Sequence, residues 1–326
     1  MSIIKTHDVT LYGGNDIDII LQPLCDDHLP LLYKWNADPE VVYWADTDSD
    51  GTQGFGEQSV RGIYGSVSQN AICFLIEANK IPIGDVWLQN MNIPEVSKMY
   101  PDLDVRRIDV SVGEKEYWGK GIGTQFIGMM VDFAFYGENV DVLHCFVGDH
   151  NIRSARTLIK NGFREVMRKE SESDKTKEKE EIHFALTKQE FIERRRVRIP
   201  PDKKIMFPLT NLQPSQLCIS AGKLRLIMEW FNPADIESFD PIPVKLLDNK
   251  ILMTDGHTRA IAAHLAGWEN VPIYWDEAEL YMRAYAIDIK WCDEENIRSP
   301  IDLAGRIVPH KDYERLWRKR CMEMAL

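Results

Sequence analysis

The chain has 326 residues, more than one typical hydrophobic core holds, so two domains are expected. Apolar residues make up 44% and charged residues 28%, the proportions of an ordinary soluble protein. No run of about 18 apolar residues exists, and the N-terminus lacks the basic and apolar regions of a secretory signal. We therefore expect no membrane span and no export, and a cytoplasmic location.

Cysteine spacing and net charge narrow the function further. The six cysteines are scattered without a CxxC pair, which argues against a zinc site and against a disulfide framework, and no metal is expected. The formal net charge of −12 disfavours nucleic acid as a partner and suits a cationic small molecule. A short basic run at 194–198 borders a Pro-Pro segment, and we interpret it as a solvated link between domains rather than a nucleic-acid contact.

Hydrophobic periodicity and turn residues predict an alternation of strands and helices. The first elements are a strand at 18–24, two short helices within 26–44, and two strands within 71–91 around a turn at 79–80. A strand at 106–112, a helix at 124–136 and a strand at 141–147 follow. The last are a helix from 151 that stops at Gly162 and two strands within 164–187 around a charged tip at 170–181. The pattern changes after about residue 198. A strand, a strand, a helix and a strand follow within 243–275, and a helix at 311–324 presents Tyr313, Leu316 and Trp317 as its apolar face.

A glycine-rich turn follows the strand at 106–112 and opens the next helix. Its sequence is Trp118-Gly119-Lys120-Gly121-Ile122-Gly123-Thr124. Free N–H groups at a helix N-terminus and the positive end of the helix dipole favour an anion, and glycines let a phosphate come close to the backbone. Neither a Walker lysine-serine pair nor a downstream ribose-binding acid accompanies this turn, so it is not a nucleotide fingerprint of those types.

The turn resembles the phosphate loop of the GNAT acetyltransferase family, although Trp118 stands where many members have Arg or Gln. A second element of that family, Asn151 with Ala155 and Gly162-Phe163, lies downstream. The resemblance spans roughly residues 15–190. It implies a GNAT fold with a central mixed, mostly antiparallel sheet flanked by helices, and acetyl-CoA as the cofactor. The turn would hold its pyrophosphate, the backbone of Val110 and Val112 would pair with its pantetheine arm, and Asn151 would lie near the far end.

Within the family the chain looks most like the aminoglycoside 6'-N-acetyltransferases, which share an Ile-Asp pair before the turn. Asp109 matches their acidic residue, and a carboxylate there would accept the proton of an attacking amine. The alternative for Asp109 is a strand-bulge residue that caps a neighbour. Trp44, Asp46, Asp102 and Asp104 form a candidate acceptor cluster, with Asp149 as a possible addition.

Two positions depart from the family pattern. Leu158 replaces a Tyr that serves many members as general acid to the leaving thiolate. Phe146 occupies the place of an Asp found in aminoglycoside enzymes, with Asp149 nearby as a substitute. These departures bear on the acceptor more than on acetyl transfer itself.

A second glycine turn, Asp255-Gly256-His257-Thr258-Arg259, lies between a predicted strand and helix. Together with the upstream stretch at 212–217 it resembles the ParB/sulfiredoxin-like superfamily, whose members hold nucleotide phosphates at such a turn. The resemblance covers about 205–285 and implies a second, smaller α/β domain. Two alternatives remain for this turn. Either its five residues bind phosphate, or the domain is purely structural and His257 is a turn residue with its hydrogen bonds satisfied.

The sequence predicts an α/β protein with a GNAT domain at 1–190, a linker at 191–204 and a ParB/sulfiredoxin-like domain at 205–326. The first hypothesis is direct acetyl transfer to a small cationic amine, aminoglycoside-like or polyamine-like. The second adds a nucleotide-binding or phosphotransferase domain, and the third is a non-catalytic sensor of CoA and nucleotide. The partners expected are a small-molecule acceptor and a homodimer copy, without nucleic acid or membrane.

Overall fold

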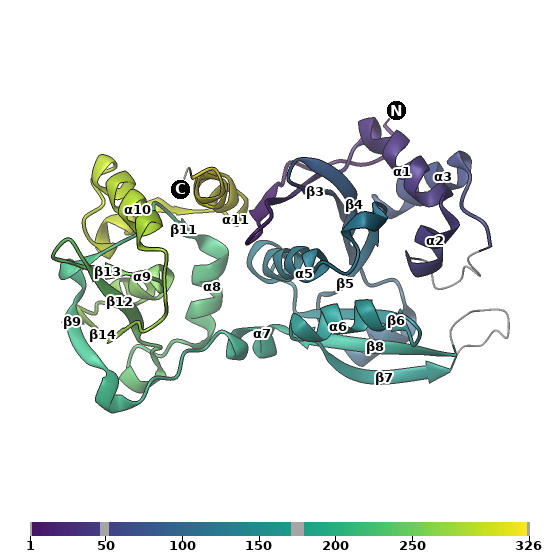
Figure 1. Cartoon of the computed structure of the whole chain (residues 1–326). Helices are drawn as coiled ribbons and strands as arrows, with labels where there is room; N and C mark the ends of the chain where they lie inside the picture. The colour runs from purple at the N-terminus through teal and green to yellow at the C-terminus, as the bar shows by residue number, and fades with distance from the viewer. Residues whose placement is uncertain (1, 46–51, 171–178, 325–326) are drawn as a thin grey trace. The chain divides into compact units, whose positions relative to one another are not determined.

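The computed structural model describes residues 2–45, 52–170 and 179–324. The chain divides into two compact units, Met1–Phe191 and Ile192–Leu326, and the boundary falls within helix α7 (Lys188–Arg194) (Figure 1). The predicted linker therefore begins in a helix.

The first unit is built on an eight-stranded sheet in the order β1-β2-β3-β4-β5-β6-β8-β7. All neighbouring strands are antiparallel except β5 and β6, which are parallel. The predicted mixed, mostly antiparallel sheet flanked by helices is therefore confirmed. The elements are β1 (Leu11–Gly13), β2 (Ile19–Pro23), α1 (Leu29–Ala37), α2 (Pro39–Ala45), α3 (Glu57–Val67), β3 (Ala71–Ala78), β4 (Ile81–Asn90), α4 (Pro94–Met99), β5 (Val105–Val112), α5 (Ile122–Asp132), β6 (Val142–Gly148), α6 (Ile152–Lys160), β7 (Arg164–Glu170) and β8 (Glu180–Thr187).

Alternation along β3 divides the apolar side chains between the two faces of this sheet. Cys73 and Leu75 pack with α1 and α3 in one buried cluster that contains Leu32 and Trp35. Phe74 points to the other face and makes an edge contact with Phe133, directly after α5, at 5.6 Å between ring centroids. Helices α1 and α3 therefore cover one face, and α5 with its continuation covers the other.

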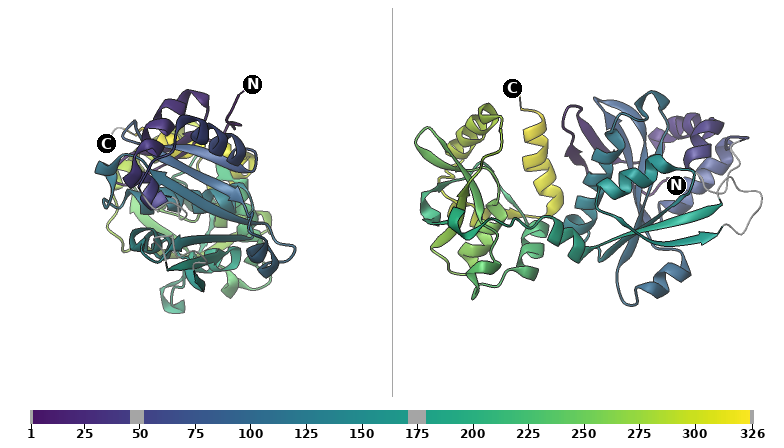
Figure 2. Two further views of the ribbon diagram at one scale, coloured as in Figure 1. Left: turned by 90° about the vertical axis from the view of Figure 1, so that its right-hand side faces the viewer. Right: turned by 60° about the horizontal axis from the view of Figure 1, so that its bottom comes forward.

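The turns that join the predicted strands agree with the sequence. Asn79 and Lys80 have φ of 49° and 67°, the left-handed pair of a two-residue hairpin between β3 and β4. Strands β7 and β8 run side by side as a hairpin (Figures 1 and 2). The sequence analysis missed the short strand β1 and the helices α3 and α4.

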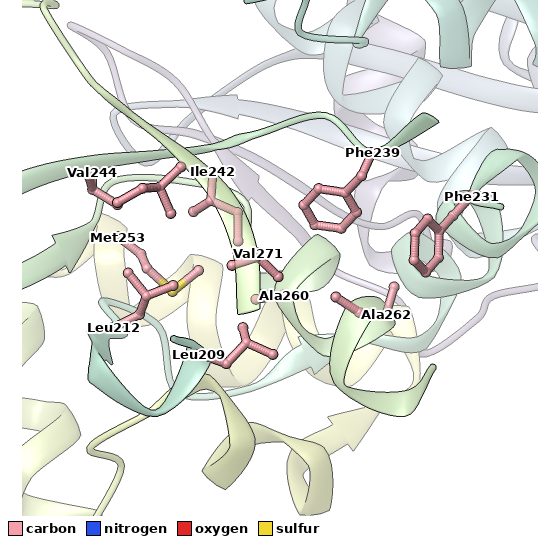
Figure 3. Packing of buried hydrophobic residues seen from close by; sticks show 12 residues of the cluster. Leu209, Leu212, Phe231, Phe239, Ile242, Val244, Met253, Ala260, Ala262 and Val271 are labelled. Carbon is pink, nitrogen blue, oxygen red and sulfur yellow. The ribbon is translucent and has the colours of Figure 1, made fainter. Parts of the chain in front are cut away.

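The second unit contains a five-stranded sheet in the order β10-β13-β12-β14-β9. The predicted run of strand, strand, helix and strand within 243–275 is confirmed as β12, β13, α9 and β14. A buried apolar cluster with Leu212, Phe239, Ile242 and Met253 fills its core (Figure 3). The elements are β9 (Ile205–Pro208), β10 (Leu212–Gln213), β11 (Ile219–Ser220), α8 (Ala221–Trp230), β12 (Ile242–Leu247), β13 (Lys250–Met253), α9 (His257–Leu265), β14 (Asn270–Trp275), α10 (Met282–Glu294), β15 (Ile307–Val308), α11 (His310–Tyr313) and α12 (Lys319–Met322).

Two expectations about this unit were wrong. Leu316 is 40% exposed, whereas Tyr313 and Trp317 are buried, because the segment from Glu314 to Arg318 is a π-helix whose wider turn shifts the apolar stripe. The basic run at 194–198 is not simply a solvated link. Arg196 donates to the carboxylate of the buried Asp240 at 2.8 and 2.9 Å and to the Ser238 carbonyl at 2.8 Å.

Among residues 2–45, 52–170 and 179–324, no helix is both long and apolar enough to cross a bilayer. The same residues contain no group of three or more His, Cys, Asp or Glu side chains placed to hold a metal ion.

Substitution of Gly84 in β4 tests the close packing of β4 against β5. A Cβ there would lie 2.1 Å from the Ser111 carbonyl oxygen and 2.9 Å from the Val112 Cα. We expect Gly84→Ala to lower the free energy of unfolding by about 2–3 kcal/mol in urea titrations, because strand backbone has to move. The control is Gly62→Ala in α3, where a Cβ meets nothing within 4 Å, and it should raise stability by about 0.5–1 kcal/mol. Equal effects of the two substitutions would contradict this packing.

Candidate active site

The two parallel strands of the first sheet separate soon after they meet. Pairing between β5 and β6 is limited to Val105 with Val142 and Arg106 with Leu143. Farther along, the Ile108 N–H points toward β6 and donates to the Cys145 Sγ at 3.4 Å. Because backbone groups alternate sides along a strand, the N–H groups of Val110 and Val112 point toward the same gap.

The glycine turn lies just beyond the end of β5. Gly119 and Gly121 have φ of 74° and 79°, and Gly121 is the N-cap of α5. A Cβ at either glycine would meet no other atom within 4 Å, so the backbone there is open. Trp118 fixes the turn to the strand, because its indole N–H donates to the Val112 carbonyl at 2.8 Å. The N-terminus of α5 therefore offers free N–H groups next to the gap between β5 and β6.

The start of α6 lies beside this turn. The Asn151 side chain caps α6 by accepting from the Ser154 N–H at 3.1 Å, and it donates to the Trp44 carbonyl at 3.2 Å. The guanidinium of Arg153 lies 4.5 Å from the centre of the Trp44 ring and 5.0 Å from that of Trp118. One cation thus bridges α2, the glycine turn and α6. The sequence analysis missed Arg153, although its place two residues after the helix cap could have suggested it.

Asp109 lies on the sheet face covered by α1 and α3. It pairs in register with Trp87 of β4, and the Arg107 side chain donates to its Oδ2 at 2.8 Å. Burial raises the pKa of Asp109, and the Arg107 charge offsets part of that rise. Arg107 also donates to Gln89 at 3.2 Å and lies over the Phe146 ring at 5.1 Å. A cationic amine approaching Asp109 would therefore have to share the carboxylate with Arg107.

A second carboxylate on this face, Asp85, was missed by the sequence analysis. It is 1% exposed, and the Tyr64 hydroxyl donates to its Oδ1 at 3.1 Å. Asp85 pairs in register with Ser111, so it is a diagonal neighbour of Asp109 across the two strands. Burial, with an addition from the Asp109 charge, raises the pKa of Asp85 to about 7 despite the opposing Tyr64 hydrogen bond. The sequence feature that could have indicated a buried site residue is the single acidic residue within the otherwise apolar strand IPIGDVWLQ.

The other predicted acceptor residues lie at different places. Asp104 precedes β5 and holds Arg106 through two bonds of 3.1 and 2.9 Å. Five residues of extended chain, roughly 16 Å, separate it from Asp109. Asp149 accepts from the Lys179 N–H at 3.2 Å, and its neighbour His150 stacks on Trp44 at 5.7 Å. The structure thus brings His150, the residue after Asp149, against Trp44, whereas the Asp149 carboxylate is engaged by Lys179. Asp46 lies outside the described residues.

The second glycine turn connects β13 to α9, as predicted. Gly256 has φ of 82° and is the N-cap of α9. His257 is buried, and its Nε2 accepts from the Ser215 N–H at 2.9 Å, while burial lowers the pKa of His257 to about 4. Arg259 is buried as well and donates to the Asp240 and Pro241 carbonyls at 3.3 and 3.2 Å. These two side chains hold the local fold.

Asp255 and Thr258 of this turn are less enclosed. The Asp255 side chain is 81% exposed and lies 3.8 Å from the Arg259 guanidinium. Lys223, in the first turn of α8, acts electrostatically on Asp255 and His257 and donates to the Tyr313 hydroxyl at 3.3 Å. Lys223 therefore acts at the start of α9, where Gly256 and His257 are buried and the Asp255 side chain is exposed.

Comparison with known proteins identifies the first unit. Residues 18–164 match the family model described as an acetyltransferase (GNAT) domain. This segment contains β5, the gap, the glycine turn and α6. Residues 18–164 are therefore a GNAT acetyltransferase domain, and the N-terminal part of the predicted resemblance is confirmed. The match stops before the second unit, whose resemblance to the ParB/sulfiredoxin-like superfamily stays a prediction.

Solved structures with a similar arrangement include three acetyltransferases. Mycobacterium smegmatis RimJ in complex with CoA-disulfide is 20% identical, with 56% of this chain and 89% of that chain covered and a TM-score of 0.46. The aminoglycoside acetyltransferase AAC(6')-Ib in complex with coenzyme A is 21% identical, with 54% and 98% covered and a TM-score of 0.42. A GNAT-family acetyltransferase from Bacillus anthracis is 13% identical, with 54% and 98% covered and a TM-score of 0.43.

The raised pKa of Asp85 predicts a pH-dependent stability. The folded chain holds this proton more tightly than the unfolded chain, so stability falls as pH rises from about 4 to about 7 and is level above that. Asp85→Asn carries no charge and still accepts from Tyr64. The free energy of unfolding of this variant, relative to that of the unsubstituted chain, should rise by up to about 4 kcal/mol between pH 4 and pH 7, because each pH unit contributes about 1.36 kcal/mol. Urea unfolding at about pH 4 and about pH 8 measures this difference. A difference that is the same at both pH values would contradict the burial of a titrating Asp85.

Proposed function

We propose that the first unit transfers the acetyl group of acetyl-CoA to an amine of a small cationic acceptor, aminoglycoside-like or polyamine-like. The observation that carries the proposal is the GNAT match over residues 18–164, which contains the separated strands β5 and β6 beside the open turn. Acetyl transfer is the shared activity of that family, whereas the acceptor class follows from the charge of this chain and of its site.

The described residues fit acetyl-CoA in three ways. The exposed N-terminus of α5 suits the pyrophosphate, because its N–H groups are free and a Cβ-free turn leaves space. The N–H groups of Val110 and Val112 point into the gap and suit the amide-bearing pantetheine arm. Lys120 within the turn and Arg153 at the start of α6 would be cations for the remaining phosphate, and Asn151 would lie near the far end of the cofactor.

The chemistry is assigned to Asp109. A neutral amine forms the new C–N bond with the acetyl carbon, the C–S bond breaks, and the amine proton passes to the Asp109 carboxylate directly or through water. Leu158 is buried and brings no hydroxyl to the thiolate, so the thiolate leaves unprotonated and takes its proton from solvent. The transfer is direct, because Cys145 is buried and its pKa is raised to about 12, which removes the thiolate needed for an acyl-enzyme.

The acceptor site is assigned to the sheet face around Asp109. Asp109 would supply negative charge, the buried Asp85 would lie behind it, and Trp44 with its neighbour His150 would supply an aromatic face. A polyamine or aminoglycoside amine would displace Arg107 from Asp109 as it binds. The competing possibility is a sensor that binds acetyl-CoA without turnover, for which the missing hydroxyl at Leu158 is the motivating feature.

Substitution of Asp109 distinguishes acetyl transfer from acetyl-CoA binding without turnover. We expect acetyl-CoA to release free thiol in the presence of a panel of aminoglycosides, polyamines and amino acids, and Asp109→Asn to lower kcat by about 100-fold or more. Asp16→Asn, which removes the same charge from an exposed loop of the same unit, should change kcat by less than about twofold. Acetyl-CoA binding without thiol release for any amine would instead favour the sensor.

We propose a second activity for the second unit, phosphate binding at the turn of residues 255–259, of the kind expected from a ParB/sulfiredoxin-like domain. The motivating observation is Lys223, which lies close enough to act on both Asp255 and His257 at the start of α9. Thr258 and the α9 N–H groups would bind phosphate oxygens. Arg259 would support the turn from behind through its bonds to the Asp240 and Pro241 carbonyls.

Lys223 is a sharper test of this second site than the buried Arg259, whose loss would disturb the fold. We expect ATP to bind the full chain in calorimetry and Lys223→Met to weaken that binding by about tenfold. Lys290→Met, at an exposed position on α10, should leave the affinity unchanged. If Lys223→Met and the unsubstituted chain bind ATP equally, the turn does not hold phosphate in this way.

A further inference from the structure

The second unit contains a cavity of about 770 Å³ that shares no residue with the 255–259 turn. Three segments line it. The first is the β9–β10 connection at 207–213, the second is the β12–β13 hairpin at 249–251, and the third is the stretch at 293–298 from the end of α10. Strands β9 and β10 form the two edges of the five-stranded sheet, and the short connection between them at 209–211 lines the cavity together with the ends of both strands. Its volume is within the range of about 300–1,000 Å³ typical of small-molecule sites.

Hydrogen bonds hold the walls of this cavity in place. Gln213 is 5% exposed, and its amide donates to the Pro214 carbonyl at 3.0 Å and to the Ile297 carbonyl at 3.4 Å. The N–H groups of Arg298 and Ser299 both donate to one carboxylate oxygen of Asp302, at 2.9 and 2.8 Å. The backbone that carries Arg298 is therefore fixed on both sides. A site held in this way has less conformational entropy to lose when a ligand binds.

The charges around the cavity are unbalanced toward positive. The Lys250 ammonium lies 3.3 Å from both carboxylate oxygens of Asp293. Among the described residues, no hydrogen bond or ion pair involves the Arg298 guanidinium. Its charge acts on the Asp302 carboxylate, which also accepts from two backbone N–H groups and the Ser299 hydroxyl. Two cations and one anion thus face a cavity in a chain whose formal net charge is −12.

We propose that this cavity binds a small organic anion. A carboxylate or phosphate group would take two N–H bonds from Arg298, the geometry that a guanidinium favours, and a further contact from Lys250. The apolar body of the ligand would lie against Phe207 and Ile251, the apolar side chains of the wall. The proposal rests neither on acetyl transfer by the first unit nor on phosphate binding at the 255–259 turn.

Three small probes with the same aromatic body test the proposal on the full chain. Phenyl phosphate, phenylacetate and the neutral phenylacetamide are titrated separately and followed by ligand-observed NMR. We expect at least one of the two anions to bind at least about tenfold more tightly than the neutral amide, and the stronger anion identifies phosphate or carboxylate as the preferred group.

Variants locate the binding. Arg298→Met should weaken the preferred anion by about tenfold, whereas Arg315→Met should not. Arg315 is an exposed arginine of the same unit that pairs with Asp312 at 3.3 Å, so its loss removes the same charge away from the cavity. Circular dichroism checks that each variant is folded.

Several results would overturn the proposal. These are binding of the neutral amide as tight as that of the anions, no binding of any probe at about 10 mM, or unchanged affinity in folded Arg298→Met. Loss of anion binding in Lys223→Met alone would place the anion at the 255–259 turn and would equally contradict a site in the cavity.

Discussion

The arrangement of the first unit depends on the early separation of two parallel strands. Strands β5 and β6 share two paired positions and then diverge, so backbone groups of β5 that would complete a ladder face a gap. Unpaired backbone groups in a folded protein need partners, from water or from a ligand. The amide-rich pantetheine arm of acetyl-CoA would supply such partners, and the helix N-terminus at the end of the gap would supply the charge complement for its phosphates.

The second constraint is the burial of charge on the sheet face that carries Asp109. Two carboxylates on neighbouring strands face one guanidinium, and one of them, Asp85, is nearly inaccessible to solvent. Burial raises the pKa of both carboxyls, the Asp109 charge adds to the rise at Asp85, and Arg107 stabilises the charge of Asp109. A cationic acceptor would be favoured here, because its ammonium group would stabilise the carboxylate charge that burial away from water destabilises.

The sequence predicted those features that depend on local rules. Gly119, Gly121 and Gly256 adopt the left-handed conformation at the turns that connect a strand to a helix, and Asn79-Lys80 forms a hairpin turn of the kind that such residues favour. Features set by tertiary pairing were missed. Asp85 is a site residue only because β4 places it diagonally across from Asp109, and Arg153 matters only because α6 begins between two tryptophans. Leu316 was misplaced because a π-helical turn shifts the helical phase, which apolar spacing alone does not reveal. For Asp104, the ion pair with Arg106 competes with any contact to a ligand.

The central claim is that the gap between β5 and β6 and the turn at its end hold acetyl-CoA. Amide hydrogen exchange across residues 105–127, with and without saturating acetyl-CoA, tests this most directly. We expect slower exchange, by about tenfold or more, at Val110, Val112 and the N–H groups of residues 121–123. Binding of acetyl-CoA with unchanged exchange at all of these amides would contradict it.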